Sequence, residues 1–187
     1  MVLQQGMNFL SGVWCQDTYD SLDASLSLSN LIETNTNYLA LSFTWSQWTV
    51  DTPGPIYSTD VTPTDAEIES IISLAHSKGV RVMVRPLVDP DWTNPNTAGT
   101  WRGEIGRNFT ESDWDSWFQS YNSMLTHYAA MSQQWRADEF CVGGELIIAS
   151  HQTDRWIDTV KQVRALYDGP LLYAANHGNE DSIEWYT

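Results

Sequence analysis

One glutamate of this 187-residue sequence has the surroundings of a catalytic group. Glu145 follows the short apolar segment 140–142 and two glycines. A carboxyl group at the end of a buried strand can project into a cleft, where it can protonate a leaving group or accept a proton from water. The same carboxylate could instead cap the following helix or pair with Arg85 or Arg102. The sequence pattern leaves both interpretations open.

Further candidates lie in or beside residues 86–108, which are rich in Pro, Asn, Asp, Gly and Trp. We expect a long loop there, and such loops in compact domains are usually functional. An indole can stack on a sugar ring, while a guanidinium can donate to hydroxyls or orient a carboxylate. Arg85, Asp89, Trp101 and Arg102 are the candidates for these contacts. Alternatively, Asp89 and Arg102 form an ion pair that only holds the loop.

Three more candidates follow predicted strands. Trp45 comes after the apolar segment 38–43 and could be a second stacking surface, or it could pack as core beneath a loop. Asn176 and His177 follow the segment 171–175 directly, so they could also reach a sugar.

The sequence contains no motif for a metal or a cofactor. No two histidines have metal-ligand spacing with a carboxylate partner, and Cys15 and Cys141 are too far apart for a zinc site or a disulfide framework. We therefore expect no cofactor, no metal, and two free, packed cysteines.

The charge balance limits the possible partners. Nine Lys and Arg against 24 Asp and Glu give a formal net charge of −15, which repels nucleic acids and anionic membranes. No apolar run approaches the roughly 20 residues of a membrane span. We therefore expect neither nucleic acid nor membrane as a partner, whereas a neutral sugar is compatible with this charge and with ten tryptophans.

Short apolar segments alternate with helical patterns, which is typical of a parallel α/β sheet. The best helix signal is Thr64 with Glu67, a capping box, and Thr110 with Asp113 is a second helix start. A later helix carries Tyr167 on its apolar stripe. The predicted strands are residues 6–10, 38–43, 80–84, 140–142 and 171–175.

Five such β/α units fit either a doubly wound sheet or a (β/α)8 TIM barrel. No glycine-rich phosphate-binding motif follows a strand, which disfavours the nucleotide-binding folds. Polar and aromatic residues instead follow strands two to five, the positions that surround the mouth of a barrel. We predict residues 1–187 to be a single, incomplete (β/α)8 domain, truncated after about the fifth strand.

The chain resembles glycoside hydrolase family 113, the endo-β-1,4-mannanase-like enzymes of the clan A TIM barrels. The order of the shared strings and their positions at strand ends carry the resemblance. These strings are Gly6-Met7-Asn8, Thr44-Trp45-Ser46-Gln47, Thr62-Pro63-Thr64-Asp65, Ala75-His76 before Gly79, Trp101-Arg102-Gly103, Tyr128-Ala129, Gly143-Gly144-Glu145-Leu146 and Tyr173-Ala174-Ala175-Asn176.

The resemblance implies a retaining glycosidase that acts on a β-linked polysaccharide, with β-1,4-mannan as the expected substrate. Glu145 matches the acid/base, and the family's nucleophile, a glutamate after strand seven, would lie beyond residue 187. We therefore expect a piece of a longer enzyme that is inactive by itself and monomeric when full length. The alternative is a non-catalytic carbohydrate-binding barrel, which the same aromatic mouth would serve.

Three residues depart from the family pattern near the expected sugar contacts: Leu87 replaces a His, Gly144 a Thr and His177 a Trp. The resemblance therefore specifies the class of reaction more firmly than it specifies mannan as the substrate. A polymer substrate favours an extracellular location, although residues 1–6 lack the features of a secretory signal.

Overall fold

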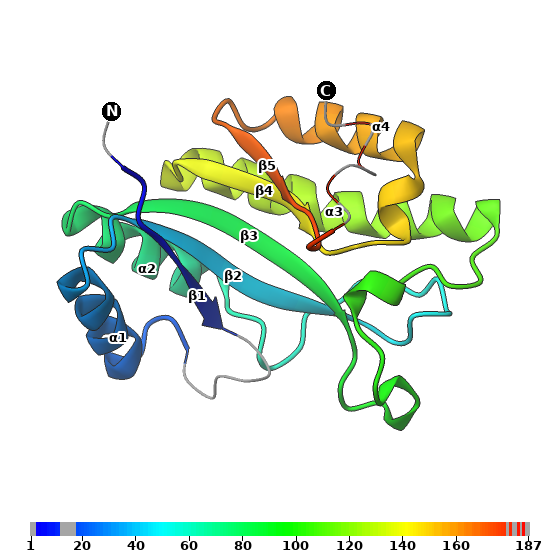
Figure 1. Ribbon diagram of the computed structural model, residues 1–187, viewed down its shortest axis with the longest axis horizontal. Coiled ribbons are helices and arrows are strands. Elements are labelled where there is room, and N and C mark those ends of the chain that lie inside the picture. Colours follow the sequence, from blue (N-terminus) through cyan, green and yellow to red (C-terminus); the bar gives the residue numbers. More distant parts are fainter. Residues whose placement is uncertain (1–2, 12–17, 179, 181–182, 184, 186–187) are drawn as a thin grey trace.

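The computed structural model describes residues 3–11, 18–178, 180, 183 and 185. Its strands form one parallel sheet in the order β1-β2-β3-β4-β5 (Figure 1). A doubly wound sheet reverses its strand order at a switch point, whereas this order never reverses. The predicted α/β class and the arrangement of the first five units of a TIM barrel are therefore confirmed. The strands are β1 (Gly6–Ser11), β2 (Tyr38–Gln47), β3 (Arg81–Pro90), β4 (Glu139–Gly144) and β5 (Leu171–Ala174).

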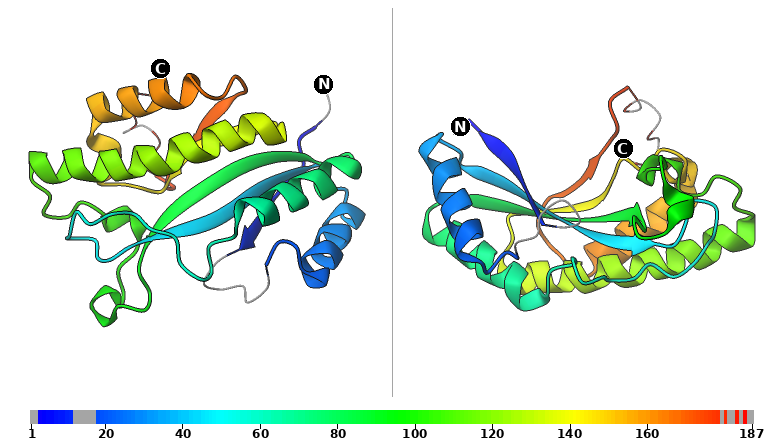
Figure 2. Two further views of the ribbon diagram at one scale, coloured as in Figure 1. Left: turned by 180° about the vertical axis from the view of Figure 1, so that it is seen from behind. Right: turned by 90° about the horizontal axis from the view of Figure 1, so that it is seen from below.

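The sheet is curved, and the helices lie along its outer side (Figure 2). They are α1 (Leu22–Glu33), α2 (Asp65–Ser77), α3 (Glu111–Trp135) and α4 (Thr153–Arg164), with single 3-10 turns η1 (Pro95–Thr97), η2 (Arg102–Glu104) and η3 (Ala149–His151). Both predicted capping boxes are present, at Thr64 with Glu67 and at Thr110 with Asp113. No helix in the described part of the chain is long and apolar enough to cross a membrane.

The main core lies between the sheet and the helices. Trp117 and Tyr121 of α3 are buried and stack on each other, and Trp156 of α4 packs edge-on against Tyr121. Trp117 also donates a 2.6 Å hydrogen bond to the buried Gln47 amide. The amide nitrogen of Gln47 donates in turn to the backbone oxygens of Thr49 and Thr52. The polar end of this buried side chain therefore has hydrogen-bond partners for both its oxygen and its nitrogen.

Two strand ends differ from the prediction. β2 continues to Gln47 and β3 to Pro90, so residues 44–47, which lie beyond the predicted strand, and residues 86–90, predicted as loop, are paired strand. The ladder runs without interruption from Phe43 opposite Pro86 to Gln47 opposite Pro90. The apolar pattern ends earlier than the backbone pairing because the neighbouring strand, not the side chains, determines where a ladder stops.

Tyr167 lies outside α4, and Cys141 has a free thiol. The sequence predicts Tyr167 on this helix, but α4 ends at Arg164 and Tyr167 follows it, where its hydroxyl donates to Ala137 O at 2.7 Å. Cys141 is buried with a free thiol, as predicted, and Cys15 lies outside the described residues.

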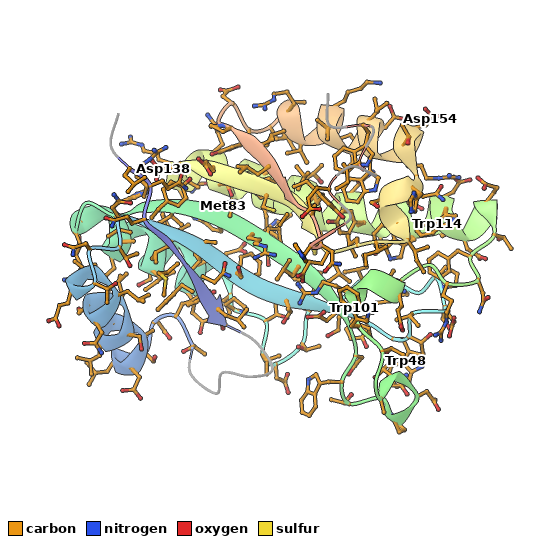
Figure 3. The ribbon with its side chains drawn as sticks, viewed as in Figure 1. Trp48, Met83, Trp101, Trp114, Asp138 and Asp154 are labelled. Atoms are coloured by element: carbon orange, nitrogen blue, oxygen red, sulfur yellow. The ribbon has the colours of Figure 1, made fainter. Side chains whose placement is uncertain are left out.

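Asp138 joins three segments at the N-terminal end of the sheet, far from Trp101 (Figure 3). Its carboxylate accepts hydrogen bonds from Val82 N–H at 2.9 Å, from Arg81 Nε at 3.1 Å and from His76 Nε2 at 3.0 Å. Burial acts to raise the pKa of Asp138, but these three hydrogen bonds outweigh it and hold the pKa below its ordinary value.

We predict that Asp138→Asn lowers the free energy of unfolding by about 1–3 kcal/mol at neutral pH, because the buried Val82 N–H and two cationic or polar side chains lose a charged acceptor. A lowered folded-state pKa means that the carboxylate stabilises the fold above its unfolded-state pKa, and that this contribution is lost as pH falls through the folded-state value. Urea denaturation from neutral pH to about pH 3 should therefore show the difference shrinking in acid.

The control is Asp158→Asn, which removes an exposed carboxylate 3.1 Å from Lys161 and should change stability by less than about 0.5 kcal/mol. A difference for Asp138→Asn that did not vary with pH would contradict the assignment.

Candidate active site

Three charged side chains meet at the C-terminal end of the sheet. Arg102 donates from Nε and Nη2 to the two carboxylate oxygens of Asp89, at 2.8 Å each. Its Nη1 lies 3.5 Å from Oε2 of Glu145. The bidentate pair fixes the guanidinium plane. The side chains of Arg102, Asp89 and Glu145 are 16%, 31% and 39% exposed, so the Glu145 carboxyl faces an accessible space.

The backbone turns sharply at Glu145. Its φ of +58° lies in the left-handed region, which is unusual for a residue with a side chain. Glu145 N–H donates to Ala174 O at 2.8 Å, and the next amide, at Leu146, donates to the Tyr173 hydroxyl at 3.2 Å. Strained backbone of this kind persists where neighbouring structure holds it, and it clusters at functional sites. β5 is the structure that holds Glu145.

The two glycines before Glu145 sit at an irregularity in the pairing of β4 with β5. A Cβ at Gly143 would lie 2.7 Å from the Tyr121 hydroxyl, on the side of the helices. A Cβ at Gly144 would lie 3.1 Å from Nη2 of Arg85 and 3.3 Å from Leu87. The family pattern has a threonine at this position, and its side chain would occupy space that the Arg85 side chain fills here.

Arg85 is close to this group without pairing with Glu145. Its Nη1 is 3.5 Å from the Asn8 side-chain oxygen, while Nη2 lies over Gly144. The Arg85 side chain therefore lies on the inner side of the sheet and reaches Gly144, the residue before Glu145. Nearby, burial raises the pKa of the Cys141 thiol, which disfavours the thiolate that a nucleophilic cysteine needs.

The loop after β3 is held by Asp91. Its carboxylate accepts from the Tyr57 hydroxyl and from the hydroxyl and N–H of Thr93. Burial, assisted by the bond to Asp91, raises the pKa of Tyr57 to about 12. Burial acts to raise the pKa of Asp91 as well, but the bonds from Thr93 and Tyr57 lower it below its ordinary value. The loop thus begins at a neutral phenol bound to a charged carboxylate.

Trp101 is 39% exposed and lines a cavity of about 260 Å³ together with Asp89 and Arg102. Trp92, which is 59% exposed, lines the same cavity. Trp92 is one of the two tryptophans of this loop but not one of the sugar contacts predicted from the sequence, because nothing in the pattern tells an exposed tryptophan from a buried one. Its position directly after Asp91 is the signal that could have found it.

Trp45 is directed away from this group. Its Nε1 donates to the Tyr128 hydroxyl at 3.0 Å, and the two rings meet edge to face. In the ladder Ser46 is opposite Asp89, so Trp45, one residue earlier, points to the other face, toward α3. The structure therefore corrects the predicted sugar contact at Trp45 to core packing, the alternative interpretation of this residue.

Asn176 and His177 follow β5, as predicted, but the His177 ring is directed into solvent. It is fully exposed, and its Nδ1 lies 3.9 Å from a carboxylate oxygen of Glu180. Asn176 Nδ2 donates to His177 O at 3.2 Å. The predicted sugar contacts at these two residues stay predictions. In the described residues, no group of three or more His, Cys, Asp or Glu side chains is placed to hold a metal ion.

We predict that Gly143→Ala destabilises the protein by about 1–3 kcal/mol, because the added Cβ meets Tyr121 and Trp156, which are both buried. Gly144→Ala is the matched control. Its Cβ meets the movable end of Arg85, so a loss below about 1 kcal/mol is expected. Thermal unfolding midpoints should separate the two variants by roughly 2–4 °C per kcal/mol. Equal shifts would show that the two glycines are not oriented as described.

Comparisons with known proteins agree with the fold of this chain. The sequence matches the model of Glycoside Hydrolase Family 113 over residues 11–187. No curated protein matches the chain. Among solved structures, the GH113 beta-mannanase AaManA from Alicyclobacillus acidocaldarius, in complex with ManMIm, is 33% identical with a TM-score of 0.84. The match covers 97% of this chain and 57% of that one.

Two further structures described as GH113 beta-1,4-mannanases match similarly. One is 25% identical with a TM-score of 0.86, and the match covers all of this chain and 60% of that one. The other is 28% identical with a TM-score of 0.84 and coverages of 96% and 58%. The chain thus spans 57–60% of the length of these structures. On the family match over nearly its whole length, the chain belongs to Glycoside Hydrolase Family 113.

Proposed function

We propose that this chain forms the first five β/α units of a retaining glycoside hydrolase that cleaves a β-linked polysaccharide. Membership of the family and the likeness to mannanases support a glycoside hydrolase. The observation that carries the assignment of the site is the position of Glu145. It follows β4 directly, its backbone is held by β5, and its carboxyl is accessible beside Arg102.

In this proposal Glu145 is the general acid/base. Its carboxyl protonates the glycosidic oxygen as the bond breaks, and its carboxylate then accepts a proton from the attacking water. Arg102, held in place by two bonds to Asp89, limits the directions in which the Glu145 side chain can turn. A proton donor fixed within reach of the leaving oxygen contributes more to the rate than one that moves freely.

The second carboxylate of a retaining enzyme lies about 5–5.5 Å from the acid/base and attacks the anomeric carbon. We place it on the seventh strand of the complete barrel, as in the family, so hydrolysis requires the complete barrel. The substrate proposed is β-1,4-mannan, because the similar structures are described as beta-mannanases.

A non-catalytic carbohydrate-binding barrel is the second candidate function. The exposed indoles of Trp92 and Trp101 favour it as much as they favour an enzyme, since both need a stacking surface. Only turnover separates the two. Release of reducing ends from mannan by the full-length protein supports the hydrolase, and binding without release supports the binding barrel.

We predict that Glu145→Gln in the full-length protein lowers kcat on mannan by about 10²–10⁴-fold, because the amide cannot donate the required proton. Aryl mannosides with activated leaving groups should lose much less in the first step, since their departing oxygen needs little protonation. Initial rates on both substrates test this expectation.

Glu69→Gln, an exposed carboxylate of α2, is the control and should leave both rates unchanged. Equal losses on the two substrates would argue against an acid role for Glu145. Unchanged rates in the Glu145 variant would remove it from the site.

A further inference from the structure

We infer that a subsite for one neutral sugar ring is formed by Trp92, Trp101, Asp89 and Arg102. We call these four residues the tryptophan subsite. The Asp89–Arg102 pair lies between the two tryptophans and Glu145. The inference rests on the proposed function, because it takes the bond to be cleaved to lie at Glu145. It adds Trp92 to the site and specifies the size and charge of the unit that is bound.

The cavity is small, which suits a single sugar unit better than a long segment of chain. Its volume is about 260 Å³, just below the range of roughly 300–1,000 Å³ that is typical of drug-sized ligand sites. Pro90, Thr97 and Thr100 complete its wall, and both threonine hydroxyls donate to backbone carbonyls of the same loop. The wall is therefore built by the loop itself, and a long segment of polysaccharide would extend beyond it.

The indole of Trp101 is fixed by its neighbour Gly103. A Cβ at Gly103 would lie 2.5, 2.6 and 2.9 Å from three adjacent atoms of the indole. Such similar distances mean that the Cβ would sit over the ring face, because an approach at the edge would make one distance much shorter than the others. One face of Trp101 thus lies on the Gly103 backbone. An indole supported in this way is preorganised for stacking.

Trp92 is exposed on a loop whose backbone is well anchored. Asp91 N–H donates to Gln47 O at 2.7 Å, the Thr97 hydroxyl donates to Asp91 O at 2.6 Å, and the Asp91 carboxylate binds Thr93. The residues on both sides of Trp92 are therefore held, while its own ring is 59% exposed. Because the exposed ring of Trp92 lines the same cavity as that of Trp101, the two indoles together offer an apolar surface for a ligand.

The polar end of the subsite suits hydroxyl groups. Arg102 uses its Nε–H and one Nη2–H on Asp89, which leaves guanidinium hydrogens for a ligand. Each Asp89 oxygen keeps a lone pair that can accept a hydrogen bond. Neighbouring sugar hydroxyls can donate to the carboxylate and accept from the guanidinium. Because Asp89 balances the charge of Arg102, the pair does not favour an acidic sugar over a neutral one.

The test uses the full-length protein with Glu145→Gln, which prevents hydrolysis during the measurement. Short β-1,4-linked manno-oligosaccharides are titrated by calorimetry. Trp92→Ala on this background should weaken binding about threefold to tenfold through the lost stacking. Its unfolding midpoint should not change, because the side chain is exposed. Gly103→Ala should also weaken binding by displacing the Trp101 ring without removing it.

Trp48→Ala is the matched control, because Trp48 lies on the neighbouring loop (Figure 3) and is 51% exposed, but is not among the residues that line the cavity. Its affinity should equal that of the parent. Unchanged affinity in Trp92→Ala, equal weakening by Trp48→Ala, or no oligosaccharide binding by the parent would each overturn the subsite.

The outcome is separable from that of the proposed function. If the protein with Glu145 intact hydrolyses no β-glycan but binding depends on Trp92, the subsite stands and the hydrolase proposal fails. If mannan is hydrolysed and Trp92→Ala leaves KM unchanged, the hydrolase proposal stands and the subsite fails.

Discussion

Parallel pairing of consecutive strands is the constraint on which the rest of this structure depends. A parallel neighbour can be reached only if the chain crosses back over the sheet, and here each described crossover passes along the outer side. All strands therefore end at the same edge. Residues as distant in sequence as Asp89, Arg102 and Glu145 meet there because β3 and β4 are neighbours.

The two ends of the sheet carry charged groups with different consequences. At the N-terminal end, the Asp138 carboxylate accepts three hydrogen bonds and joins β3, α2 and the start of β4. At the C-terminal end, Glu145 has a left-handed backbone and a carboxyl group that is 39% exposed. Fully bonded charges stabilise a fold, whereas strain beside an accessible charge is what catalysis can use.

Local signals predicted much of the fold. The capping boxes at Thr64 and Thr110 act within one helical turn, so the sequence alone reveals them. The ends of β2 and β3 depend on a partner strand, and the direction of Trp45 depends on its position in the ladder opposite β3. A short window of residues encodes neither the strand ends nor this direction. The sequence therefore could not show that Trp45 packs against α3 in the core.

The sequence by itself made Glu145 a candidate, because this residue follows an apolar segment and two glycines, and the resemblance to a glycosidase family implied the reaction class to expect. Only the tertiary structure decided which side chains accompany Glu145. The folded chain brings Arg102 to the carboxylates of both Asp89 and Glu145, a proximity that the sequence does not reveal. Side-chain direction follows from strand register, backbone strain and packing between elements, and these forces act between residues far apart in the chain.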